Sequence, residues 1–479
     1  MSTLQKLGYS CCKQGKSRRI ERQILRLSHL PPEILVEIVK HIEWNDVLSI
    51  RRVCCRTLHS VSKDREVWVS LLRRYCDTVI PRPFFLSKPV ELCSGDDLEA
   101  RVVQWWTGWG GLQSTVQTFT ADGSIPDIWG PLCPLPGDRY FLYKTNDGSI
   151  FYCNPGQPDA PMHLLLPSPC PQDPCVDVCV AIDVLGTQNI NLESSLPSAS
   201  SFEHRLFPPV FRLAVVRSSS TTDSVEIWEI RPEVQGEAIV YSARLLKSFV
   251  DNIRTTCCSL LGDHVAYGLP SLGGTKIVDW TAVADGRPVL GIHIAFSSPL
   301  YILLLPRRRI LVHSSYIYIA DWNACRQFDS SPTSRIRPQW RSTERFCLLH
   351  PYSLPFLIDN SFRLIMCSAE RPTLTGVIVS NDPDVAVSDT VTFAQLADCV
   401  RDAHDELWFD YRKGVCVFGK KQRAHLLCYK WPGDSLPEPS FSEVAFPKHT
   451  YTIYVDKSHA RSRVVMFIYK RPLKTEFFG

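Results

Sequence analysis

Several short motifs contain residue types that perform chemistry in other proteins. Residues 414–421, Gly-Val-Cys-Val-Phe-Gly-Lys-Lys, contain the Gly-x-x-x-x-Gly-Lys pattern of a phosphate-binding loop. Such a loop needs a Ser or Thr after the lysine to hold magnesium, and it connects a strand to a helix. Here Lys421 takes the place of the Ser or Thr, and the alternating interior predicts a strand that leads into another strand. Nucleotide binding is therefore not expected at this segment.

Motifs for hydrolysis or metal binding are missing from the sequence. It contains no Gly-x-Ser-x-Gly and no His-Glu-x-x-His, and its 13 histidines are scattered. His404 lies beside Asp405 and Glu406, and we interpret it as a solvated residue. The group Asp382, Asp384 and Asp389 lacks the glycine and the terminal Glu of a calcium loop. The sequence thus predicts a protein that is not an enzyme and has no cofactor and no metal.

The cysteines indicate the compartment. There are 19 in 479 residues, an odd number with irregular spacing and no Cys-x-x-Cys pair. The closest cluster, Cys170, Cys175 and Cys179, has no nearby His, whereas zinc ligands usually come in pairs two to four residues apart. We expect reduced, mostly buried thiols in an intracellular protein of the cytoplasm or nucleus.

Composition and charge exclude several classes of protein. With 44% hydrophobic and 21% charged residues the chain has an ordinary globular composition, and a net charge of +4 does not favour nucleic acid as a partner. No run of about 18 apolar residues exists, so no membrane contact is expected. The first 26 residues form a basic, polar tail without the apolar stretch of a signal peptide.

Residues 27–76 are predicted to be helical. Pro31 and Pro32 suit the first turn of a helix, because proline gives up an amide that has no partner there. Apolar residues then recur three and four positions apart. Asn45 or Asp46 can cap a second helix that runs on to Val61, and Asp64 can cap a third. About 50 residues make a small core, so part of this apolar surface should contact a partner.

This segment resembles an F-box in order, spacing and residue types, over about a tenth of the chain. It departs at Thr57, where many F-boxes have a tryptophan. In that family the segment docks on the Skp-type adaptor of a Skp–cullin–F-box ubiquitin ligase. The resemblance implies an adaptor-binding role for Leu30, Pro31, Ile34, Leu35, Ile38, Ile42, Val47, Leu48, Val53, Cys54 and Trp68. The alternative is a three-helix subdomain packed on the rest of the chain.

Residues 77–115 are predicted to join the helical segment 27–76, which we name the head, to the rest of the chain. Three prolines between residues 77 and 90 indicate a stiff connection. A helix capped by Ser94 or Asp96 then presents an apolar face that includes Trp105, Trp106 and Trp109. Such a stripe is usually core, and we interpret it as the helix that clamps the head to a β domain.

Residues 116–479 show the period of two that is typical of strands. Hairpin-like units end at Trp228, Trp280, Trp322 and Trp431, which are 52, 42 and 109 residues apart. A degenerate repeat of this length predicts a β-propeller with six to eight blades. The Pro- and Ser-rich segment near 155–205 is predicted to be an insertion outside the blades. A pair of irregular β-sandwiches is the alternative.

The Trp-terminated repeats resemble degenerate WD-type blades, although they lack the Gly-His element and most of the structural Asp. Helical head, Trp-bearing helix and β repeats together resemble the expanded F-box family of basidiomycete fungi. The predicted fold is thus mainly β behind a small all-α N-terminal domain. The function implied is that of a substrate receptor whose β domain captures a client protein. A scaffolding propeller and an enzyme with a propeller pocket are the alternatives.

Basic turns are the candidate client-binding site. They comprise two groups in different repeats, which an acidic or phosphorylated segment could contact if both turns share one face. Charged turn residues that are merely solvated are the alternative. The residues are Arg307, Arg308, Arg309, Lys420, Lys421 and Arg423.

Overall fold

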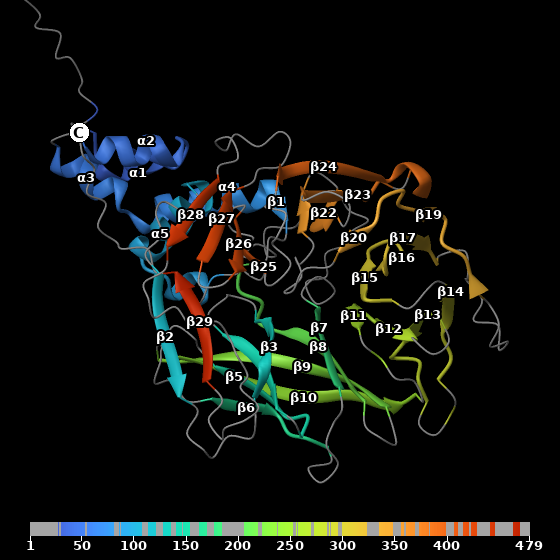
Figure 1. Ribbon diagram of the computed structural model, residues 1–479. Coiled ribbons are helices and arrows are strands. Elements are labelled where there is room, and N and C mark those ends of the chain that lie inside the picture. Colours follow the sequence, from blue (N-terminus) through green and yellow to red (C-terminus); the bar gives the residue numbers. More distant parts are fainter. Residues whose placement is uncertain are drawn as a thin grey trace, which may run out of the picture.

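The computed structural model shows a helical head beside a ring of β-sheets (Figure 1). The structure describes residues 27, 30–52, 55–80, 86, 88–107, 114–120, 128–135, 140–145, 147–153, 162–169, 177–183, 206–218, 223–236, 238–251, 255, 257–269, 273–284, 287, 289–295, 299–322, 335–347, 356–358, 361–368, 373–382, 384–398, 407–410, 415–420, 423–428, 441–445 and 463–469.

The head contains five α-helices in the described part of the chain. They are α1 (Pro32–Val39), α2 (Trp44–Arg51), α3 (Arg56–Ser62), α4 (Arg65–Thr78) and α5 (Gly95–Thr107), with a 3₁₀ turn η2 (Val90–Leu92) before α5. The start of α1 is as predicted, with Pro31 at the N-cap position. The predicted Asp64 cap is confirmed, since the Glu66 amide donates to Asp64 Oδ1 at 2.8 Å.

The predicted second helix is wrong in its extent. The chain forms two helices, α2 and α3, because Cys55 has an extended backbone with φ −111° and ψ 113°. The break lets Val47 of α2 and Leu58 and Val61 of α3 all face one core. The predicted Asn45 or Asp46 cap is also wrong: Glu43 holds the N-cap position and makes no side-chain cap hydrogen bond.

Seven sheets follow in the described residues, six of them with four or more strands. The first three contain β3 (Ile128–Pro134), β4 (Phe141–Thr145), β5 (Ile150–Cys153) and β6 (His163–Leu166); β7 (Asp177–Asp183), β8 (Phe211–Ser218), β9 (Asp223–Gln235) and β10 (Ala238–Val250); and β11 (Cys258–Leu261), β12 (His264–Leu269), β13 (Gly274–Asp279) and β14 (Ile292–Ala295), which β18 (Arg335–Ile336) joins.

The next three sheets repeat the same order of strands. They contain β15 (Tyr301–Leu305), β16 (Arg309–His313), β17 (Ile317–Asp321) and β19 (Trp340–Arg341); β21 (Phe356–Ile358), β22 (Ser361–Ser368), β23 (Thr373–Ser380) and β24 (Val391–Asp398), with β1 (Val79–Ile80) and β20 (Phe346–Cys347) added and η4 (Val387–Asp389) before β24; and β25 (Leu407–Asp410), β26 (Val415–Lys420), β27 (Arg423–Cys428) and β28 (Phe441–Ala445).

Sequential antiparallel sheets arranged around a ring make this domain a β-propeller (Figure 1). The first strands of successive sheets, β7, β11 and β15, contact one another. The seventh sheet pairs β2 (Ser114–Thr120) with β29 (Arg463–Tyr469), so the beginning and the end of the β domain meet in one sheet. The fold class predicted from the sequence is thus confirmed.

Trp280 and Trp322 directly follow β13 and β17, as predicted, whereas β9 continues past Trp228 to Gln235, and Trp431 lies outside the described residues. The predicted insertion does not hold throughout. Between residues 155 and 205 the structure has β6 as the fourth strand of one sheet and β7 as the first strand of the next. Pro167 directly follows β6, which is an edge strand and therefore tolerates a neighbouring proline. Residues 184–205 lie outside the described residues.

Apolar cores lie between successive sheets and not within them. In β8, Leu213 and Val215 face the β3–β6 sheet, whereas Ala214 and Val216 face the β11–β14 sheet. In β16, Ile310 faces the preceding sheet in the same manner. Central strands are therefore buried on both faces, which explains why they are almost continuously apolar in sequence.

Buried polar groups connect neighbouring sheets. Arg217 on β8 pairs with Glu226 on β9, and its Nε and Nη2 donate to the carbonyls of Gly148 and Pro167 at 3.2 and 3.3 Å. Both side chains of the ion pair are almost fully buried. Because a buried charge is costly without partners, these contacts fix how the β3–β6 and β7–β10 sheets sit on each other.

Candidate functional site

One side of α1 is apolar and uncovered. Ile34 and Ile38 are 49% and 39% exposed, and Leu27, which precedes the helix, is 46% exposed. Pro31 is exposed between them. Ile34 and Ile38 lie four positions apart and so share one face of the helix, and Pro31 precedes Ile34 by three positions. Together with Leu27 we name these residues the α1 stripe. Leu35, which is fully buried, lies on the adjoining face of the helix.

The other residues expected to bind the adaptor lie around or beneath the α1 stripe. Leu30, Ile42 and Leu48 are partly buried against the core of the head. Val47 and Trp68 are fully buried, as Leu35 is, so they support the stripe from within. Val53 and Cys54 lie outside the described residues.

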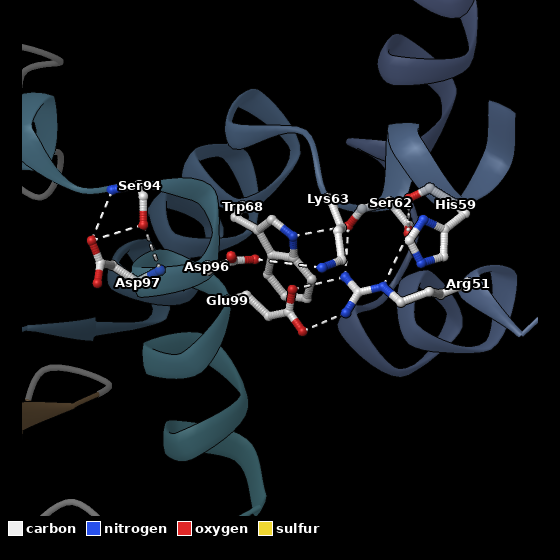
Figure 2. Close-up of polar contacts among 9 residues, drawn as sticks. All are labelled: Arg51, His59, Ser62, Lys63, Trp68, Ser94, Asp96, Asp97 and Glu99. Carbon is white, nitrogen blue, oxygen red and sulfur yellow. Dashed lines mark hydrogen bonds and ion pairs between the residues drawn. The ribbon is translucent and has the colours of Figure 1, made fainter. Parts of the chain in front are cut away.

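A network centred on Ser62 joins four helices of the head (Figure 2). The Ser62 carbonyl accepts hydrogen bonds from Trp68 Nε1 and from Arg51 Nη2, both at 3.0 Å. Nη1 and Nη2 of Arg51 also donate to Oε1 and Oε2 of Glu99 on α5, at 2.6 and 2.7 Å. Such a two-pronged contact fixes orientation as well as distance. Because α1 packs on α3 and α4, the α1 stripe belongs to a unit that includes α5.

The start of α5 is fixed by a capping box, also drawn in Figure 2. The Asp97 amide donates to Ser94 Oγ at 3.1 Å, and the Ser94 amide donates to Asp97 Oδ2 at 2.9 Å. Burial raises the pKa of Asp97, but hydrogen bonds from Lys88 and Ser94 more than offset this and lower the pKa. The predicted Ser94 cap is confirmed.

Two contacts connect the head to the ring. α4 continues directly into β1, which pairs antiparallel with β21 through Val79 and Ile358. The Leu86 amide donates to the Leu206 carbonyl at 2.5 Å, and Leu206, from the connection between β7 and β8, is buried in the core of the head. The predicted connection at 77–90 thus includes a strand of the β domain. The structure does not describe the side chains of Trp105 and Trp106, and Trp109 lies wholly outside the described residues.

The three consecutive arginines have different surroundings. Arg307 and Arg308 form the β15–β16 turn with φ of 59° and 56°, a left-handed conformation that costs energy for residues other than glycine. Arg308 is exposed and lies 5.4 Å from the Trp322 ring centroid. Arg309 is buried, and its guanidinium donates to the Ser380 carbonyl at 2.8 Å. Arg309 thus connects two sheets.

The second basic group lies at a different kind of turn. Lys420 ends β26 and Arg423 begins β27, while Lys421 lies outside the described residues. This turn joins the second and third strands of its sheet, whereas the turn of Arg307 and Arg308 joins the first and second. Antiparallel strands reverse direction at each turn, so these two kinds of turn lie at opposite ends of a sheet. The structure therefore does not bring the two groups to one end.

A third basic cluster is not among the residues predicted from the sequence. Tyr316 lies against the side chains of Arg341 and Arg345. The signal available in the sequence is the density of arginines between residues 335 and 345, but the tyrosine that organises two of them is about 25 residues away.

Sites for other chemistry are not found in the described part of the chain. Residues 415–420 form a strand that leads into β27, so the loop-like motif there lacks the helix that phosphate binding needs. No group of three His, Cys, Asp or Glu side chains gathers closely enough to hold a metal ion in the described ranges. No described helix is long and apolar enough to cross a membrane.

Three solved β-propeller domains show a distant likeness to this chain. No family model and no curated protein matches the chain. The WD40 domain of SCAP from fission yeast is 8% identical with a TM-score of 0.35, and the match covers 71% of this chain and 92% of that one. For the WD40 domain of Toxoplasma gondii coronin the identity is 11%, the TM-score 0.32, and the coverage 66% of this chain and 73% of that one. The β-propeller domain of Myceliophteria thermophila Cps50 (Swd1) is 10% identical with a TM-score of 0.28, covering 63% of this chain and 95% of that one. At such TM-scores these likenesses carry no argument, and the propeller fold follows from the strand order.

Proposed function

We propose that this protein is a substrate receptor of a Skp–cullin–F-box ubiquitin ligase. The helical head docks on a Skp-type adaptor and through it on the cullin, while the propeller holds a client protein. The observation that carries the proposal is the α1 stripe, an uncovered apolar surface on helices whose sequence resembles an F-box.

The size and rigidity of the stripe suit an interface. Leu27, Pro31, Ile34 and Ile38 leave large apolar surfaces in water, and burial of each would be favourable by about 25 cal/mol per Å². Isolated exposed apolar residues are ordinary, but Ile34 and Ile38 share one helix face, and apolar residues at this spacing are typical of helix-mediated recognition. The core beneath it is ordered before binding, which keeps the entropic cost of docking low.

The connection between head and ring suits a receptor that positions its client. The Arg51–Glu99 contact makes the head rigid, and the β1–β21 pairing and the burial of Leu206 hold it against the ring. A ligase of this kind accelerates transfer by proximity, because it raises the effective concentration of a client lysine near the charged ubiquitin carrier. A rigid connection keeps that distance fixed.

Truncation of the stripe tests the proposal. In Ile34→Ala/Ile38→Ala, adaptor affinity measured by calorimetry should fall by at least about tenfold, because central apolar contacts at interfaces often contribute more than about 1 kcal/mol each. The matched control is Leu245→Ala on β10, which removes a side chain of similar exposure, 46%, from the ring. It should leave adaptor affinity unchanged. Leu30→Ala/Pro31→Ala extends the test to the beginning of the stripe.

Undiminished adaptor binding by the correctly folded stripe variant would contradict the docking surface. Failure of the wild-type chain to bind any Skp-type adaptor, with the head folded, would contradict the ligase function itself and leave a scaffolding propeller as the account.

A further inference from the structure

Two arginines converge on one tyrosine on the outer strands of the β15–β17 sheet. The guanidinium carbon of Arg341, at the end of β19, lies 3.8 Å from the centroid of the Tyr316 ring. Arg345 Nε donates to Tyr316 Oη at 3.1 Å. Both arginines are exposed, and Tyr316 is partly exposed. We name these three residues the Tyr316 cluster.

The Tyr316 cluster and the connection to the head lie at opposite faces of the ring. Tyr316 lies in the turn between the second and third strands of its sheet, away from the 306–308 turn. The head enters the ring where Val79 pairs with Ile358, at the end of β21. The same end of that sheet accepts the hydrogen bonds of Arg309, which follows the 306–308 turn. A molecule at the Tyr316 cluster therefore leaves the head's connection unobstructed.

Arg341 contacts the ring of Tyr316 and is exposed to solvent. A guanidinium that stacks on an aromatic ring retains its planar edge of N–H groups for an oxyanion. Hydrogen bonding from Arg345 and, after it, from Arg341 lowers the pKa of Tyr316, as expected for an oxygen in positive potential. In the described part of the chain no carboxylate lies within ion-pair distance of Arg341. The carbonyl of nearby Glu344 accepts from Ser342 Oγ at 2.8 Å.

We propose that the Tyr316 cluster binds an oxyanion carried by a protein segment, either a phosphorylated side chain or an Asp or Glu carboxylate. This deepens the proposed function and rests on it in one respect, namely that the propeller captures a client. The Arg341 guanidinium supplies paired N–H donors, and Arg345 adds a second positive charge beside the phenol hydroxyl. Charge-assisted contacts of this kind combine strength with defined geometry.

A protein segment fits this cluster better than nucleic acid does. Binding of single strands relies on open aromatic faces on which bases stack. In the cluster a guanidinium covers a face of Tyr316, so that face is already occupied. The net charge of +4 over the whole chain also gives no extended field for a phosphate backbone. The cluster therefore recognises a local anionic group.

Immobilised peptide pools provide the test with the purified full-length chain. Three pools are identical except for a fixed central residue, which is phosphoserine, glutamate or serine. The chain should be retained by at least one of the two anionic pools and not by the serine pool. Greater retention by one anionic pool identifies the source of the oxyanion. Arg341→Gln/Arg345→Gln should reduce retention by roughly tenfold or more, since hydrogen bonds between charged groups are among the strongest.

Matched variants separate the site from general charge effects. Arg231→Gln/Arg244→Gln removes two exposed arginines that contact Glu229 on the β7–β10 sheet, and retention should be unchanged. Arg341→Lys keeps the charge but loses the planar fork, and it should also bind more weakly. Retention in these assays needs no adaptor, so failure of the ligase proposal and failure of this site give different results.

Three results would overturn the inference. The first is equal retention by the serine pool. The second is equal loss in the Arg231→Gln/Arg244→Gln control, which would indicate a general charge effect. The third is displacement of the anionic peptides by an equal concentration of single-stranded DNA, which would assign the cluster to nucleic acid.

Discussion

Apolar side chains of the ring and of α1 have opposite surroundings although their residue types are alike. In β8, successive residues such as Leu213 and Ala214 are buried on alternate faces by two neighbouring sheets. In α1, Leu35 is buried, whereas Ile34 and Ile38 are 49% and 39% exposed among the described residues. The central strands of the ring thus use their apolar residues for folding, whereas under the proposed function Ile34 and Ile38 of α1 contact the adaptor.

The largest effect on stability is expected at the buried ion pair of the ring. Arg217→Met leaves the Glu226 carboxylate buried without its partner, so the free energy of unfolding should fall by about 3–5 kcal/mol. Denaturant unfolding followed by tryptophan fluorescence measures it. In Arg217→Met/Glu226→Gln no unpaired charge remains, so much of the loss should be recovered. An equal loss in both variants would show that packing and not charge sets the cost.

Adjacent residues of α1 should differ sharply in their effect on folding. Leu35→Ala removes a fully buried side chain and should cost about 2–5 kcal/mol of unfolding free energy. Ile34→Ala removes an exposed one and should change it by no more than about 0.5 kcal/mol. Thermal unfolding of the two variants decides. Similar losses at both positions would mean that a part of this chain covers Ile34.

The smallest effect is a dependence on pH within the ring. His313 is fully buried, its Nε2 lies 2.9 Å from the Phe346 carbonyl oxygen, and its Nδ1 has no partner among the described residues. Burial lowers the pKa of His313, and the hydrogen bond to Phe346 opposes this only in part. The native state therefore binds fewer protons than the unfolded state, whose histidines titrate near pH 6.5.

Above about pH 6.5, His313 should contribute no pH dependence to the free energy of unfolding. As the pH falls below this value, the free energy of unfolding should fall by at most about 1.4 kcal/mol per pH unit. Unfolding measured between pH 5 and 8 should show a flatter profile for His313→Gln, which keeps a donor toward Phe346. His264, whose pKa burial also lowers, contributes the same sign and remains in both proteins. An unchanged profile in the variant would assign the dependence to other groups.

Sequence pattern was sufficient where the structure is local. The hairpin of β16 and β17 follows from alternating apolar residues between turn signals, and the Ser94 cap follows from the acidic turn after it. The break between α2 and α3 could not be predicted, because apolar spacing continues through it. Likewise β6 was missed, since the prolines near it in the sequence indicate a loop.

Features that depend on distant contacts were out of reach. Leu206 lies in a Ser-rich stretch, and its burial in the head follows only from how the connection between β7 and β8 folds back. The Tyr316 cluster joins a turn to residues about 25 positions later. For the same reason the alternation along the chain did not show that Arg309 is buried whereas Arg308 is exposed.

Amide hydrogen exchange of the full-length chain, with and without a purified Skp-type adaptor, tests the central claim most directly. If the head docks on the adaptor through the α1 stripe, adaptor binding should slow exchange in peptides covering residues 27–42. Exchange in peptides from β15–β17 of the ring should be unchanged. Slower exchange confined to the ring, or no change at an adaptor concentration that saturates a known F-box protein, would contradict it.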